Sequence, residues 1–156
     1  MCTEHLMTSE KKFSRLDSLM SKISRSLGKT KKAILDEFEL TCSQFEILSA
    51  IYQISLNNNE VIQIELAEKT QIDPMTTSTI LRNLEKRELI TRQRGLVNTR
   101  TVEVELTELG LKMYYEAQIK INQMQKEVYQ NMDDQDFMNQ LLLLSNKLNN
   151  VNFSNL

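Results

Sequence analysis

The only proline of the chain, Pro74, follows Asp73 in the middle of two helical patterns, and this pair constrains the fold most strongly. Proline lacks a backbone N–H and has a fixed φ, so it suits the first position of a helix and interrupts one that would run through it. The aspartate before it can cap the new helix. The segment IQIELAEKTQIDPMTTSTILRNLEKREL therefore predicts a short helix, a tight connection and a second helix, which is a helix-turn-helix.

The second of these helices is predicted to have two unlike faces. The buried stripe at helical spacing is Thr77, Ile80, Leu81 and Leu84. The outward residues are Met75, Thr76, Ser78, Thr79, Arg82, Asn83 and Lys86. Hydroxyls early in a helix, followed by cations, suit the major groove of B-form DNA, where they can meet base edges and phosphates. The plainer alternative is a solvated face whose hydroxyls only cap the helix.

A basic hairpin is predicted directly after this helix. Val102, Val104 and Leu106 alternate with polar residues, which is the period of a half-buried strand, and residues 90–94 can pair with them across GLVNT. The chain has a formal net charge of -2, yet residues 82–100 hold six cations against Glu85 and Glu88. The six are Arg82, Lys86, Arg87, Arg92, Arg94 and Arg100. Any contact with nucleic acid must therefore be local, and Arg94 and Arg100 are the candidates for the narrow minor groove.

The rest of the chain predicts long helices, because it contains only three glycines. A first helix is expected through Leu35, with a second capped by Thr41 or Ser43, and two more are expected after the hairpin. The first two apolar stripes are Phe13, Leu16, Met20, Ile23, Leu27, and Phe45, Leu48, Ile51, Tyr52. The last two are Tyr114, Ala117, Ile121, Met124, Val128, and Phe137, Leu141, Leu144, Leu148, Val151. These stripes exceed what so small a helix-turn-helix can cover, so burial against a second copy is expected.

Other functional classes find little support in the residues. Cys2 and Cys42 are too few and too far apart for a disulfide framework or a zinc motif, and His5 is the single histidine. There is no apolar run long enough to span a membrane and no signal-peptide core, so a soluble, cytoplasmic chain is expected. We expect neither a cofactor nor a metal site, and no catalytic constellation predicts an enzyme.

The ordered segments LTCSQFEIL, ELAEKT, LEKRELITR and NTRTVEVELTELG resemble those of MarR-type winged helix-turn-helix regulators, from about Leu40 to Gly110. The resemblance implies a mainly α fold with a β-hairpin wing. Its expected domains are residues 1–40 and 109–156 for dimerisation and residues 41–108 for DNA binding. It also implies a homodimer that binds a pseudo-palindromic DNA operator, most often as a repressor.

Carried over by position, the recognition helix is residues 74–87, and the family's D-x-R wing motif falls on Asn98, Thr99 and Arg100. In that pattern the arginine enters the minor groove and an acidic residue braces it. Here Asn98 takes the place of the acid, and an amide can brace the guanidinium without its charge. The family often has glycine where this chain has Gln71 and Glu88, so these residues must either accept a left-handed backbone or use another turn.

The resemblance also implies a small aromatic or phenolic effector. The candidate pocket residues are Ile23, Leu27, Phe45, Leu48, Tyr52 and Tyr114, for each of which packing in the core is the favoured alternative. Some relatives sense peroxides through a cysteine, so Cys42 or Cys2 is a candidate redox switch, with a small buried residue as the plainer reading. A winged-helix protein-interaction module and a ligand-binding protein without DNA activity stay open as rivals.

Overall fold

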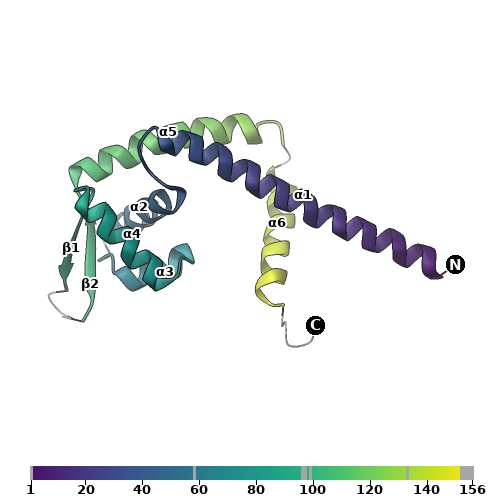
Figure 1. The fold of residues 1–156 in the computed structure, drawn as a ribbon, viewed down its shortest axis with the longest axis horizontal. Helices are drawn as coiled ribbons and strands as arrows, with labels where there is room; N and C mark the ends of the chain where they lie inside the picture. Colours follow the sequence, from purple (N-terminus) through teal and green to yellow (C-terminus); the bar gives the residue numbers. More distant parts are fainter. Residues whose placement is uncertain (1, 58, 96–97, 99, 133, 152–156) are drawn as a thin grey trace. The chain divides into compact units, whose positions relative to one another are not determined.

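The computed structural model describes residues 2–57, 59–95, 98, 100–132 and 134–151, in two units, residues 1–120 and 121–156. The elements in chain order are α1 (Cys2–Asp36), α2 (Cys42–Ser55), α3 (Gln63–Thr70), α4 (Pro74–Lys86), β1 (Ile90–Arg94), β2 (Val102–Leu106), α5 (Glu108–Tyr129) and α6 (Asp134–Asn149) (Figure 1). The predicted fold class, mainly helical with a hairpin, is confirmed. No helix within the described ranges is both long and apolar enough to cross a membrane.

Helix α4 begins where the Asp73-Pro74 pair predicts it. The Asp73 carboxylate accepts a hydrogen bond from the backbone N–H of Thr76 at 2.9 Å, and Pro74 occupies the first turn. Hydrogen bonds from the side chain and the backbone of Thr76 lower the pKa of Asp73. The predicted stripe of Thr77, Ile80, Leu81 and Leu84 is buried. The Thr77 hydroxyl donates to the carbonyl of Ile72, so this polar core residue also secures the turn between α3 and α4.

Helix α2 is the centre of the first unit. Thr41, rather than Ser43, is its cap, and it forms a reciprocal pair with Gln44 in which each side chain accepts from the other's backbone N–H. The residues Ile47, Leu48, Ala50 and Ile51 are all buried. Helices α1, α3 and α4 and strand β2 all contact α2, so this short helix supplies the core on which the wing and the helix-turn-helix rest.

The two positions to which the resemblance assigns glycine, Gln71 and Glu88, adopt left-handed backbone angles. Gln71 ends α3 with φ 56° and ψ 24°, and Glu88 follows α4 with φ 59°. After α4, the N–H of Leu89 bonds to the carbonyl of Leu84 and the N–H of Glu88 to that of Glu85, which closes the helix as a Schellman motif. Both residues therefore accept a left-handed backbone instead of using another turn. This conformation costs each of them about 1 kcal/mol or more of conformational free energy.

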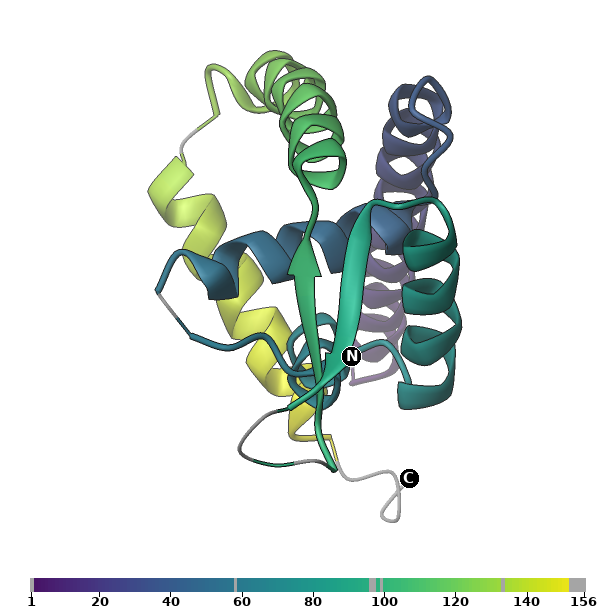
Figure 2. The same ribbon diagram turned by 90° about the vertical axis from the view of Figure 1, so that its left-hand side faces the viewer.

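The hairpin pairs β1 with β2 as predicted, and the structure sets its register, with Ile90 opposite Leu106 and Arg94 opposite Val102. Strand β1 lies beside α4, and β2 lies against α2 (Figure 2). The segment before α3 joins the hairpin as well, because the N–H of Val104 donates to the carbonyl of Val61 at 2.8 Å. Since Val104 is fully buried, the base of the wing is fixed to the helical body.

Several long apolar side chains lie exposed in each unit. On α1 they are Phe13, Leu16, Leu19, Met20 and Ile23. On α6, described by itself, they are Phe137, Met138, Leu142, Leu143, Leu144 and Leu148. Such runs of exposed apolar residues are unusual on the surface of a monomer.

Two glycines give a stability test with opposite signs. A methyl group on Gly110, at the start of α5, would overlap the carbonyl of Leu89, whereas nothing lies within 4 Å of one on Gly28 in α1. We expect Gly110→Ala to lower the free energy of unfolding by about 1–3 kcal/mol through overpacking. Gly28→Ala should raise it by about 0.5–1 kcal/mol, because alanine favours the helix.

Chemical denaturation of both variants at one fixed protein concentration measures these changes. If Gly110→Ala unfolds at the same denaturant concentration as the unchanged protein, the close approach of α5 to Leu89 is wrong.

Candidate nucleic-acid interface

The predicted contact residues of α4 lie mainly on its surface. Thr76, Thr79, Arg82 and Lys86 are exposed, and Ser78 is half-buried. The Thr79 hydroxyl donates to the carbonyl of Met75 at 3.1 Å and accepts a hydrogen bond from Arg82 Nη2 at 3.2 Å. Of the three predicted hydroxyl contacts, that of Thr79 is therefore engaged within the helix.

Arg87 and Arg92, two of the six cations in the basic segment, stabilise the fold. The Arg87 guanidinium donates to the carbonyl of Glu39 at 2.7 Å and to that of Phe38 at 3.2 Å, which ties the end of α4 to the turn after α1. Arg92 donates from Nε to Glu85 at 3.0 Å, and this ion pair joins β1 to α4. The charge count along the sequence could not separate these two from the rest. The cations left exposed to solvent are Arg82, Lys86, Arg94 and Arg100.

The wing carries Arg94, Asn98 and Arg100, all of them exposed. Asn98 braces the backbone here, since its side-chain oxygen accepts from the N–H of Arg100 at 3.1 Å. This bond forms an Asx-turn, in place of the expected hydrogen bond from the Arg100 guanidinium to Asn98. The backbone carbonyl of Asn98 also accepts from the N–H and the hydroxyl of Thr101. Thr99, the middle residue of the motif, lies outside the described residues.

A hollow of about 300 Å³ brings the wing and the helix-turn-helix together. Its lining residues are Ile62, Gln63, Ile64, Pro74, Arg100, Thr101 and Val102. Two parts of the predicted interface, Arg100 on the wing and Pro74 at the start of α4, thus line the same hollow. The sequence analysis did not assign the start of α3 to this surface. The spacing of apolar residues in α3 does not reveal which turn of that helix faces the hairpin.

Three of the candidate effector residues, Phe45, Tyr52 and Tyr114, form an aromatic cluster. The ring of Tyr114 stacks on Phe45 with centroids 5.8 Å apart and lies 4.9 Å from that of Tyr52. Leu48 and Tyr114 are buried, as the core-packing alternative expects, while Ile23 is 43% exposed on α1 and Leu27 is half-buried.

Tyr115 belongs to this cluster although the sequence did not point to it. Its hydroxyl lies 2.6 Å from that of Tyr52, and the hydrogen bond with Tyr52 raises the pKa of Tyr115. Tyr114 and Tyr115 are neighbours in the chain, and the periodic stripe selected only the first of them. Since Tyr115 is 44% exposed, the hydroxyl pair marks the open edge of the cluster.

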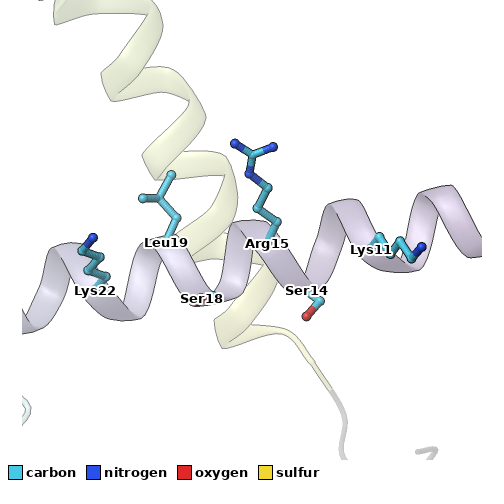
Figure 3. Close-up of a pocket in the computed structure, with 6 residues that line it drawn as sticks. All are labelled: Lys11, Ser14, Arg15, Ser18, Leu19 and Lys22. Atoms are coloured by element: carbon cyan, nitrogen blue, oxygen red, sulfur yellow. The ribbon is translucent and has the colours of Figure 1, made fainter.

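A second hollow, of about 650 Å³, runs along α1 and is lined by one face of that helix (Figure 3). The lining residues are Lys11, Ser14, Arg15, Ser18, Leu19 and Lys22. It contains none of the predicted effector residues. Cys42 is a free, half-buried thiol, whereas the side chains of Cys2 and His5 lie outside the described part of the chain.

Comparison with known proteins agrees with this geometry. The family model described as MarR family matches residues 40–102, which include α2, α3, α4 and β1. An uncharacterized HTH-type transcriptional regulator of Bacillus subtilis, YdcH, is 35% identical over 86 residues. The match covers 55% of this chain and 56% of that relative, so it spans little more than half the length of each.

Solved structures are similar to this fold over most of the chain. A MepR–DNA complex from S. aureus matches with a TM-score of 0.74 and 23% identity, over 84% of this chain and 92% of that one. Wild-type MarR from E. coli in its apo form matches with a TM-score of 0.65 and 19% identity, over 85% and 96% of the two chains. At these identities the two matches demonstrate a shared fold.

The division of the cations into structural and exposed groups is testable. Arg87→Met removes two hydrogen bonds to backbone carbonyls, so it should lower the free energy of unfolding by about 1–2 kcal/mol. Arg82→Met should change it by less than about 0.5 kcal/mol, because Arg82 is exposed, and should instead weaken binding to duplex DNA. Denaturation and DNA titration of both variants measure the two effects. Equal loss of stability in the two variants would contradict the division.

Proposed function

We propose that the chain is a winged helix-turn-helix protein of the MarR family, whose model matches residues 40–102, and that it is a sequence-specific, DNA-binding transcriptional regulator. The proposed regulator is a cytoplasmic repressor, and the binding of a small molecule releases it from DNA. The helix α4 addresses the major groove and the wing addresses the minor groove.

The observation that carries the proposal is the placement of the exposed cations. Arg82 and Lys86 lie on α4 and Arg94 and Arg100 on the wing, in a chain whose formal net charge is -2. The remaining two cations of the segment are bound within the fold. A local basic surface on an acidic protein supports attraction to phosphate at one face.

A homodimer is the second part of the proposal. The exposed apolar residues of α1 and of α6 supply surface that a second copy would cover. Two copies related by a two-fold axis would present two α4 helices to a pseudo-palindromic operator. Sedimentation of the purified protein at micromolar concentration gives the oligomeric state, and a monomer would contradict this part.

DNA binding is tested by fluorescence anisotropy across a salt series. The probes are a duplex that the protein selects from a randomised library and a scrambled duplex of the same composition. We expect tight binding to the selected duplex alone, with an affinity that falls by a log-log slope of about -0.9 for each phosphate contact. Weak and equal binding to both duplexes would favour the rival, a protein-interaction module whose basic surface meets an acidic partner.

The wing assignment makes its own prediction. Arg100→Ala should weaken binding to every duplex by about tenfold and make the salt slope shallower by about 1 for each wing, because a cation leaves the DNA. Lys112→Ala is the matched control, since Lys112 is an exposed cation of α5 that pairs with Glu116. If Arg100→Ala behaves like Lys112→Ala, the wing does not contact DNA.

The effector is proposed to act at the open edge of the aromatic cluster. The Tyr52 and Tyr115 hydroxyls can exchange their mutual hydrogen bond for one to a phenol or carboxylate. With 4-hydroxybenzoate as the probe, we expect thermal stabilisation and weaker DNA binding, both reduced by Tyr52→Phe and not by Tyr129→Phe, at the last residue of α5. Identical responses of the two variants would place the effector elsewhere.

A further inference from the structure

The helix α4 begins with an unusually exposed apolar side chain. Met75, its second residue, is 80% exposed, the highest value among the large apolar residues that the structure describes. Single exposed apolar residues are common on protein surfaces, so exposure alone assigns no role. Its position is informative, because Met75 stands at the N-terminal end of the helix that carries Arg82 and Lys86.

The neighbouring residue on the same face of α4 is Thr79, one turn later. Its hydroxyl is already used twice, as donor to the carbonyl of Met75 and as acceptor from Arg82. The group of Thr79 that makes no polar contact is its methyl. Met75 and the methyl of Thr79 stand one turn apart on one face of α4, and we call them the Met75–Thr79 patch; the bond from Arg82 to Thr79 holds a cation beside it.

The major groove offers one apolar group on its base edges, the C5-methyl of thymine. We propose that the Met75–Thr79 patch contacts a thymine methyl, so that each operator half-site has an A·T pair facing the start of α4. This inference rests on the proposed function and names thymine as one base that α4 recognises. It replaces readout by the hydroxyl of Thr79 with apolar readout, while Arg82 reaches the adjoining phosphate or guanine.

The test removes a single methyl from the DNA. The probe is the duplex that the unchanged protein selects from a randomised library, with each thymine of one half-site replaced in turn by deoxyuridine. We expect one replacement to weaken binding by about fourfold, the effect of losing one buried methyl. Met75→Ala should lose most of this difference, and Met75→Ala combined with Thr79→Ser should lose all of it.

The controls separate this contact from general effects. Leu56→Ala removes a comparably exposed apolar residue at the end of α2, so the fourfold difference should persist in it. The salt slope should stay the same in Met75→Ala, because no charge is removed.

Two outcomes overturn the inference in different ways. If the library yields a preferred sequence but no thymine replacement matters, or if the effect is undiminished in Met75→Ala, only the patch assignment fails. If the library yields no preferred sequence, the proposed function fails and the patch assignment fails with it.

Discussion

The structure depends on the junction at residues 87–89, where α4 ends and the wing begins. The Arg87 guanidinium binds two carbonyls of the turn after α1, and the carbonyl of Glu88 accepts from the hydroxyl of Thr107. Leu89 bonds back to Leu84 through its N–H and accepts from the N–H of Thr107 through its carbonyl, against which Gly110 packs. Four segments of the first unit meet at this point, so the angle between helix and wing is fixed by bonds from both sides.

The same junction explains why a strained backbone is tolerated. Glu88 adopts a left-handed angle that costs a non-glycine residue about 1 kcal/mol or more. The hydrogen bonds of the Schellman motif require that angle, and the hydroxyl of Thr107 adds a hydrogen bond to the carbonyl of the same residue. Glutamate can therefore occupy this left-handed position, which the sequence resemblance assigns to glycine, at a modest cost in stability.

Whether a cation of residues 82–100 is bound within the fold or exposed to solvent depends on the position of its helix or strand. Arg87 and Arg92 point to acceptors supplied by other parts of the fold, whereas Arg82 and Lys86 lie on the outer side of α4. The exposed set is thus smaller than the six that the segment contains, yet it spans both the helix and the wing. This separation makes a local electrostatic surface compatible with an acidic chain.

The sequence by itself determined the elements and their faces. The period of apolar residues, the Asp73-Pro74 pair and the alternation from Val102 to Leu106 are local features, and local torsions and capping decide helices and strands. The pairing of the two strands and the buried stripe of α4 follow from them and are confirmed. Only the tertiary structure decided which side chains find partners. Arg87 and its acceptors, Arg92 and Glu85, and Tyr52 and Tyr115 are pairs made by chain folding, over separations that no periodic pattern encodes.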